Sequence, residues 1–213
     1  MLHAFDLDHT LLKGNSSFHF YFYLLAQRFY PFKSLYSSSW LYLKYRFLRM
    51  ELRDLHKAAF SLFLKGISEK QLAHLGVEFV EKYWAKMQNT KVTSLLRAAQ
   101  NKAHFTLILS SSPSFLVEPF AKKFCVSSFQ GTEYLVDQED KINQISSLMI
   151  GQNKAKALHS FAKKAGILLS DTIAYSDSFS DLPFLESAGK KIAIDPDARL
   201  YRICQEKGWE VLS

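Results

Sequence analysis

Four short, uninterrupted apolar segments constrain the fold of this chain more than any other feature. Strands that are buried on both faces of a parallel sheet are continuously apolar, whereas half-exposed strands alternate. The predicted strands are Leu2–Leu7, Phe105–Leu109, Thr172–Tyr175 and Lys191–Ile194. Helical patterns such as Lys154–Lys164 and Asp181–Ala188 fill the intervals. Strands that alternate with helices predict an α/β fold with a doubly wound, mostly parallel sheet and right-handed crossovers.

The segment from residue 15 to residue 90 does not follow this alternation. It contains no convincing strand and predicts helices over Phe18–Tyr30, Ser34–Met50, Leu52–Leu64 and Ser68–Gln88. An all-helical insertion directly after the first strand would cover the carboxyl end of that strand. We therefore expect an α/β core domain made of residues 1–14 and 91–213 and a helical cap domain made of residues 15–90.

The composition limits the class of protein. With 213 residues, 48% of them hydrophobic and 22% charged, the chain can bury a sizeable globular core. Its formal net charge of +7 suits an anionic partner such as a phosphate compound, a nucleic acid or an acidic membrane surface. Cys125 and Cys204 lie far apart, which predicts two reduced, mostly buried thiols in a cytoplasmic protein. The chain starts without a signal-peptide pattern, and the apolar run Phe20–Ala26 is too short to span a bilayer.

Acidic residues follow two of the predicted strands. Asp6 and Asp8 are two positions apart, so on a strand they would point the same way and repel each other unless a cation lies between them. Such a pair alone is often only a turn. Asp177 and Asp181 follow another strand, although Asp181 could simply cap a helix that begins near Pro183. Carboxylates that converge at one sheet edge require a hard divalent cation, and Mg²⁺ is the natural choice.

Two further positions suggest phosphate binding. Ser110 ends a strand, so its hydroxyl and nearby backbone N–H groups, especially that of Ser111, could face a phosphate near a helix start. An ordinary polar strand end explains the same residues. Lys154 begins a predicted helix, where a cation is unfavourable with the helix dipole, although most lysines are simply solvated.

Together these segments resemble the four ordered motifs of the haloacid dehalogenase superfamily, and within it the phosphoserine-phosphatase-like branch, subfamily IB. The matching residues are Phe5–Leu12 (FDLDHTLL), Leu107–Ser110 (LILS), Lys154 and Ser176–Asp181 (SDSFSD). The resemblance implies a Rossmann-like sheet with an all-helical cap inserted between the first and second motifs.

The resemblance also implies a phosphatase mechanism. Asp6 would attack phosphorus and form an aspartyl-phosphate, and Asp8 would act as general acid and then as general base. Ser110, Ser111 and Lys154 would bind the phosphoryl oxygens. Mg²⁺ would be held by Asp6, the Asp8 carbonyl oxygen and Asp177, with Thr10 and Asp181 in support.

Several positions depart from the family pattern. His9 follows the second acid where a small residue, often Gly, is usual, and Ser176 stands where Gly usually precedes the metal-binding Asp. Ser180 occupies a place where phosphoserine phosphatases tend to have Asn. The segment Leu12–His19 lacks the Glu with which those enzymes would hold an amino group, which argues against phosphoserine as the substrate.

The cap sequence leaves two interpretations open. The predicted helix Phe18–Tyr30 is apolar around nearly its whole circumference, and the cap is basic. It is either a packed aromatic core with solvated basic faces or an amphiphilic surface that meets anionic lipid or a greasy phosphorylated substrate. The basic residues are Arg28, Lys33, Lys44, Arg46, Arg49, Arg53 and Lys57.

The leading expectation is therefore a Mg²⁺-dependent phosphomonoesterase that acts on a small phosphorylated substrate. A phospholipid-head-group phosphatase at an anionic membrane surface and a phosphotransferase on the same fold are the alternatives. The complete set of acids, serine and lysine argues against a non-catalytic scaffold. A nucleic acid partner is disfavoured because the basic residues match no known reading motif.

Overall fold

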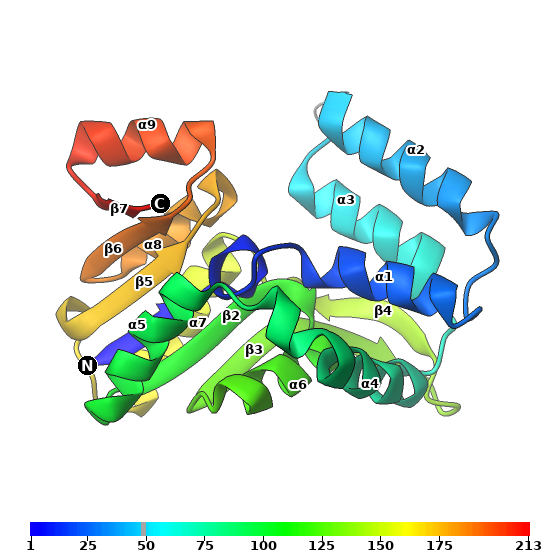
Figure 1. The fold of residues 1–213 in the computed structure, drawn as a ribbon, viewed down its shortest axis with the longest axis horizontal. Coiled ribbons are helices and arrows are strands. Elements are labelled where there is room, and N and C mark those ends of the chain that lie inside the picture. Colours follow the sequence, from blue (N-terminus) through cyan, green and yellow to red (C-terminus); the bar gives the residue numbers. More distant parts are fainter. Residues whose placement is uncertain (48–49) are drawn as a thin grey trace.

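In the computed structural model, residues 1–47 and 50–213 are described. The described strands form one seven-stranded sheet in the order β4-β3-β2-β1-β5-β6-β7 (Figure 1). All neighbouring strands are parallel except β3 and β4, which confirms the predicted mostly parallel α/β fold. The strands are β1 (Leu2–Phe5), β2 (Phe105–Pro113), β3 (Ser128–Val136), β4 (Ile142–Ser147), β5 (Thr172–Ser176), β6 (Lys190–Ile194) and β7 (Glu210–Leu212).

Helices cover both faces of the sheet, because successive side chains of a strand point to opposite sides. On β1, Phe5 joins the apolar cluster of α5 (Thr90–Asn101) and α6 (Ser114–Phe124). Its neighbour Ala4 joins the cluster on the other face. That second face is covered by α7 (Gln152–Lys164), α8 (Leu182–Ser187) and α9 (Ala198–Lys207).

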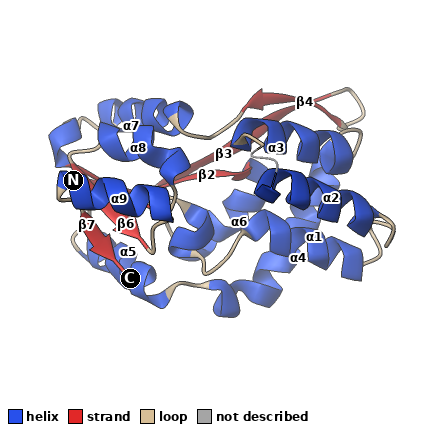
Figure 2. Cartoon of the chain, turned by 90° about the horizontal axis from the view of Figure 1, so that it is seen from above, coloured by secondary structure: helices blue, strands red, loops and turns tan. Residues whose placement is uncertain are grey.

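The segment between β1 and α5 is helical, as expected. It contains α1 (Ser16–Ala26), α2 (Ser34–Phe47), α3 (Leu52–Ala59) with a wide turn (Phe60–Leu64), and α4 (Glu69–Met87). The long helix α4 packs along α6, and its Leu72 and Phe79 belong to the same apolar cluster as Phe5. By contrast, α2 and α3 stand away from the sheet (Figures 1 and 2).

Two predictions about the helices and thiols need correction, and the end of a third falls outside the described residues. The helix predicted over Phe18–Tyr30 ends at Ala26, and Arg28 then takes a left-handed conformation (φ 59°). The end of the predicted helix Ser34–Met50 falls on residues 48 and 49, so Arg49 lies outside the described residues, as does the side chain of Arg46. Cys204 is buried as expected, but Cys125 is exposed.

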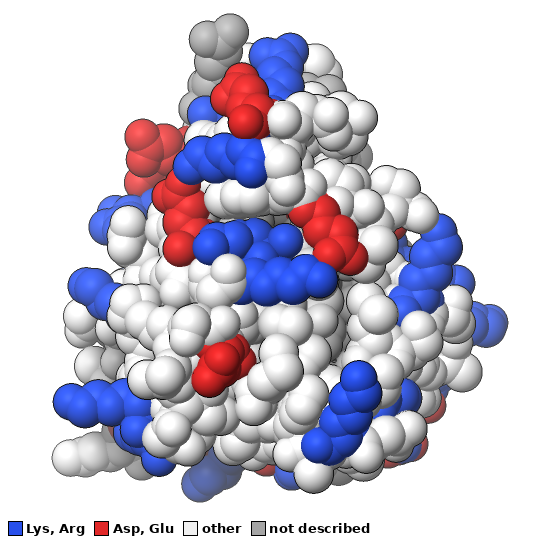
Figure 3. Space-filling model, turned by 90° about the vertical axis from the view of Figure 1, so that its left-hand side faces the viewer, with Lys and Arg blue, Asp and Glu red and all other residues white. Residues whose placement is uncertain are grey.

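Basic side chains do not gather into one stripe on the face that Figure 3 shows. Lys and Arg are scattered there, and several lie beside Asp or Glu. A protein that tracks nucleic acid usually presents a continuous basic groove or patch. This face therefore offers no support for such a partner.

Candidate active site

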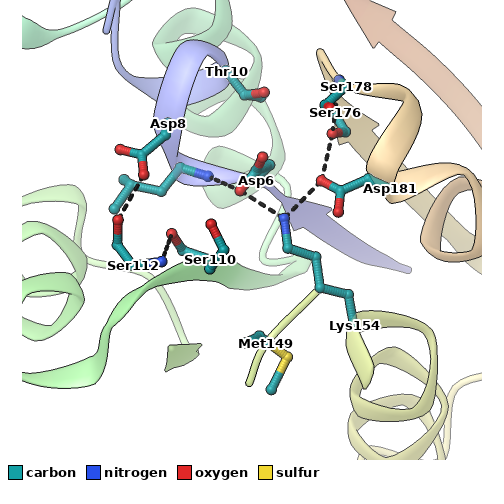
Figure 4. A network of polar contacts seen from close by, with 12 residues as sticks. Asp6, Asp8, Thr10, Ser110, Ser112, Met149, Lys154, Ser176, Ser178 and Asp181 are labelled. Carbon is teal, nitrogen blue, oxygen red and sulfur yellow. Dashed lines mark hydrogen bonds and ion pairs between the residues drawn. The ribbon is translucent and has the colours of Figure 1, made fainter. Parts of the chain in front are cut away.

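The predicted catalytic residues meet where the central strands end. Asp6 follows β1, Ser110 lies near the end of β2, and Ser176 closes β5. Because β2 and β5 flank β1 on opposite sides, the chain switches direction here, which is where open α/β sheets bind ligands. Figure 4 shows the side chains of Asp6, Ser110, Ser176 and Asp181 turned toward this edge.

A wide turn redirects the chain directly after Asp6. The backbone N–H of Leu7 donates to Asp6 Oδ1 at 2.7 Å, and the N–H of Leu12 reaches back to the Leu7 carbonyl oxygen at 2.9 Å. Within this turn His9 has a positive φ of 56°. Residues other than glycine rarely adopt such a backbone conformation, which explains why the motif of the superfamily that the sequence resembles usually has a small residue, often Gly, at this position.

Lys154 is the electrostatic centre of the site. Its side chain is only 2% exposed, and its Nζ lies 2.8 Å from Asp6 Oδ1 and 2.7 Å from Asp181 Oδ2. Burial alone lowers the pKa of Lys154, but Asp181 and Asp6 raise it above its usual value, so the ammonium stays charged. Asp181 in turn accepts a hydrogen bond from Ser176 Oγ at 2.7 Å. The serine that departs from the family pattern thus helps to hold the carboxylate that binds Lys154.

Asp8 is fixed by partners from two regions of the chain. Its Oδ1 accepts a hydrogen bond from the backbone N–H of Ser16, the first residue of α1, at 2.6 Å, and its Oδ2 accepts one from Ser112 Oγ at 2.7 Å. Ser112 Oγ also lies 3.0 Å from Ser16 Oγ and 2.8 Å from Ser17 Oγ. The predicted acid–base residue is therefore tied both to the sheet and to the start of the cap.

Ser112 was not among the predicted site residues. The sequence did contain a signal, because residues two apart on a strand share a face. Ser112 therefore points to the same side as Ser110, whose Oγ accepts a hydrogen bond from the Ser112 N–H at 3.1 Å. At the intervening residue, Ser111, the carbonyl oxygen accepts a hydrogen bond from Thr132 Oγ1 on β3 at 2.7 Å.

The site carries more negative than positive charge. Burial raises the pKa of Asp6, Lys154 opposes that rise, and Asp181 and Asp177 add to it. Burial also raises the pKa of Asp177 to about 6, with His9 lowering it and Asp181 raising it further. Thr10 Oγ1 donates to Asp177 Oδ1 at 3.4 Å. A divalent cation beside Asp6 and Asp177 would favour the ionised forms of both carboxylates.

The predicted metal ligands suit Mg²⁺ better than they suit a metal ion that is bound by protein side chains alone. Within residues 1–47 and 50–213, no three Asp, Glu, His or Cys side chains converge closely enough to hold a metal ion. Mg²⁺ typically uses one or two carboxylates and fills its other positions with water and substrate phosphate oxygens. Asp6, Asp177 and the Asp8 carbonyl oxygen fit that requirement.

One cap residue that the sequence did not single out influences the site. Burial lowers the pKa of His56 on α3 to about 4, while Asp8 raises it and Lys154 lowers it. The His56 imidazole therefore lies within electrostatic range of Asp8 and Lys154. A lone histidine in an amphipathic helix carries no sequence signal that distinguishes it from an ordinary packed residue.

A groove of about 570 Å³ lies beside the same helix. Arg53 and Lys57 of α3 form one side, and polar residues of β4 form the other. The groove extends to Asn153, which immediately precedes Lys154. Its remaining lining residues are Phe60, Ser61, Asn143, Gln144, Ile145, Ser146, Ser147 and Leu148.

Comparison with known proteins identifies the family. The model of the haloacid dehalogenase-like hydrolases matches residues 4–186, so the chain belongs to this family. Within it, the chain is phosphoserine phosphatase-like, which agrees with the resemblance seen in the sequence motifs.

Relatives of this chain include named phosphatases. The phosphoserine phosphatase SerB1 of Mycobacterium tuberculosis is 27% identical over 213 residues, which cover 97% of this chain and 68% of the relative. A histidinol-phosphatase of Neisseria meningitidis is 28% identical over 155 residues, or 70% of each chain. Among solved structures, a protein of unknown function from Bordetella pertussis Tohama I has the same fold, with a TM-score of 0.85 and 22% identity over 100% of this chain and 97% of that one.

Proposed function

We propose that this chain is a Mg²⁺-dependent phosphatase that hydrolyses a small phosphomonoester through an aspartyl-phosphate on Asp6. The observation that carries this proposal is the buried ion pair of Lys154 with Asp6 at the carboxyl end of the central strand. A buried ammonium that touches a buried carboxylate opposes the rise in pKa that burial causes, so Lys154 favours the ionised form of Asp6 that a nucleophile requires and leaves positive charge beside the incoming phosphate.

The residues of the chain divide the reaction between them. Asp6 Oδ attacks phosphorus as the bond from phosphorus to the leaving oxygen breaks, and Asp8 donates its proton to that oxygen. Asp8 then takes a proton from a water molecule, whose oxygen attacks phosphorus and releases inorganic phosphate and free Asp6. Ser110 and Lys154 bind the phosphoryl oxygens throughout.

The metal has a limited role in this scheme. Asp6, Asp177 and the Asp8 carbonyl oxygen would hold Mg²⁺, with Thr10 and Asp181 fixing Asp177 and Lys154. When bound, Mg²⁺ neutralises charge on the phosphoryl group and favours its approach to the carboxylates.

The groove beside α3 is our candidate site for the leaving group. Its basic and amide side chains suit a polar or anionic group and do not suit a long alkyl chain. Two relatives are named for phosphoserine and for histidinol phosphate, which are both small, polar phosphomonoesters. The first turn of α1 offers Asn15 and serines where a phosphoserine phosphatase would have Glu, so a substrate without a free α-amino group fits better.

The test is an assay of aryl phosphate hydrolysis with Mg²⁺ and with chelator. Activity should disappear in chelator, return with Mg²⁺, and be abolished by Asp6→Asn but not by Asp171→Asn, which changes an exposed acid outside the site. Full activity in excess chelator, or an active Asp6→Asn variant, contradicts the proposal.

A panel of soluble phosphate esters and lipid phosphates, scored for released phosphate and for transfer to alcohols, then identifies the substrate class. In this panel, Arg53→Ser with Lys57→Ser should raise the KM of anionic esters more than that of neutral aryl esters. Preference for lipid phosphates would favour the head-group phosphatase alternative.

A further inference from the structure

The outer side of α2 carries a line of exposed apolar side chains. Tyr36, Trp40 and Leu43 are 83%, 60% and 45% exposed, and Phe32, just before the helix, is 69% exposed. Within the helix, spacings of four and three residues place Tyr36, Trp40 and Leu43 on one side of the helix axis, and Phe32 lies just before the first turn. Large aromatic groups that remain in water at adjacent positions usually mark a contact surface.

This exposure does not arise from a detached helix. On the opposite side of α2, Leu41 is buried, and Leu35 and Ser38 are half-buried. The start of the helix is held by a hydrogen bond of 2.9 Å between Ser34 Oγ and Tyr21 of α1. Figures 1 and 2, which view the molecule from perpendicular directions, both show α2 on the outside of the cap. The inner side is therefore packed and the outer side remains open.

The charges near this line are basic. The sequence of α2, SLYSSSWLYLKYRF, contains no Asp or Glu. Lys33 is exposed beside Phe32, and Lys44 Nζ lies 5.4 Å from the centre of the Trp40 ring. The exposed residues between the aromatic ones include Ser37 and Ser39, which are small enough to leave the rings prominent.

We propose that Phe32, Tyr36, Trp40 and Leu43 form a docking surface for an anionic lipid bilayer. Trp and Tyr prefer the boundary between lipid and water, and neighbouring lysines are attracted to anionic headgroups. A bilayer also accepts a narrow convex line of side chains without offering a matching groove. A second copy of this chain fits less well, because apposing the two lines would bring Lys33 and Lys44 close to their own counterparts.

The attachment would be peripheral and reversible. No helix in the described ranges, 1–47 and 50–213, is long and apolar enough to cross a membrane. A few interfacial side chains together with two lysines give binding that salt weakens, because the electrostatic part is screened. The proposal does not depend on the phosphatase activity, since none of these residues belongs to the catalytic site.

The experiment is cosedimentation with vesicles of phosphatidylcholine alone and of phosphatidylcholine mixed with phosphatidylglycerol. The wild-type chain should bind the mixed vesicles, more weakly at high salt, and Tyr36→Ser with Trp40→Ser should weaken partitioning by about tenfold or more. The matched control is Leu168→Ser with Tyr201→Ser, which removes exposed apolar groups from the α/β core and should leave binding unchanged.

Folding and activity controls keep the result interpretable. Circular dichroism should show both double variants folded, and both should hydrolyse the soluble aryl phosphate at the wild-type rate. If the wild-type chain does not bind mixed vesicles, or if the α2 variant binds as well as the wild type, the proposal is wrong. Concentration-dependent self-association that the α2 variant abolishes would overturn it in favour of a second copy of the chain.

Discussion

Lysine–carboxylate pairs are buried and short at the carboxyl ends of the strands, whereas the pair of Lys57 with Asp54 in the cap is exposed and longer. At the sheet edge Lys154 is 2% exposed and touches two carboxylates within 2.8 Å. In the cap the side chain of Lys57 is 63% exposed, and its Nζ lies 3.8 Å from Asp54. Buried pairs with short contacts fix a reactive geometry, whereas exposed pairs contribute little energy and can rearrange. Under the proposed function, the carboxyl ends of the strands would supply the chemistry and the cap would select the substrate.

The largest effect should follow removal of the buried ammonium. Lys154→Met leaves Asp6 and Asp181 buried without their cation, which should cost about 3–5 kcal/mol of unfolding free energy. Under the proposed mechanism, the same change also removes a donor to the phosphoryl group and should lower kcat by about a thousandfold. Urea unfolding and steady-state kinetics measure both quantities.

Lys156→Met provides the matched control, because Lys156 is an exposed residue on the same helix. It should change the unfolding free energy by less than about 0.5 kcal/mol. Equal effects of the two changes would mean that the buried network contributes nothing special, and the contrast between sheet edge and cap would fail.

The next effect is a pH dependence of stability that arises near the amino end of the central strand β1. His3 is buried at the start of β1, where its Nδ1 lies 3.0 Å from Tyr175 OH and its Nε2 lies 3.1 Å from His104 Nδ1. Burial, helped by His104, lowers the pKa of His3 to about 4 from an ordinary 6.5. Between these values the unfolded chain binds more protons than the folded chain, so stability is complete above pH 6.5 and falls as the pH drops toward 4.

The loss that His3 causes should reach about 3 kcal/mol at the acidic end of that window. His3→Gln should flatten the slope of unfolding free energy against pH by this amount. His56 of the cap, whose pKa burial also lowers to about 4, adds a slope of the same sign that His56→Gln should remove. If His3→Gln leaves the slope unchanged, His3 is not buried as a neutral group.

The grouping of polar residues at the carboxyl ends of the strands could be predicted from the sequence because each of them lies at or directly after the end of a buried apolar run of the α/β repeat. Each strand end is marked by a change from apolar to polar residues, so Asp6, Ser110 and Asp177 could be placed together from the four apolar runs alone. The strands β3, β4 and β7 were missed because β3 and β4 form a half-exposed antiparallel hairpin with a register shift, and β7 has only three residues.

The cap was predicted less well for a physical reason. An apolar helix can be packed on all sides or can leave one side in water, and the sequence pattern is the same until its neighbours are known. In α1, Phe20 and Tyr23 are buried while Phe18 is exposed, and the longest exposed aromatic line lies on α2 instead. The position of α3 places His56 near Asp8 and Lys154, and no local sequence pattern specifies that position.

A smaller effect should test how the two regions are joined. Ser112→Ala removes a hydrogen bond of 2.7 Å to Asp8 Oδ2 and should lower kcat by about tenfold, because the carboxylate that we propose as acid and base loses one of its two positioning contacts. Its pH–rate profile should also change on the limb that reports the general acid. Ser17→Ala is the control, since Ser17 Oγ reaches Ser112 but not Asp8, and it should lower kcat far less. Equal losses would assign the hydroxyl cluster to cap folding rather than to Asp8.

The smallest effect comes from two backbone positions that share one geometry, His9 at the sheet edge and Arg28 in the cap. Both are exposed and have φ near 56–59°. Glycine should relieve about 1 kcal/mol of strain at each, offset in part by its greater freedom in the unfolded chain, for a net gain of about 0.5 kcal/mol. Denaturant unfolding should therefore show both His9→Gly and Arg28→Gly slightly stabilised. Activity should separate them, because His9 lowers the pKa of Asp177 and Arg28 lies far along the chain beyond α1. An Arg28→Gly variant that lost as much activity as His9→Gly would show that the cap shares in the chemistry that we assign to the sheet edge alone.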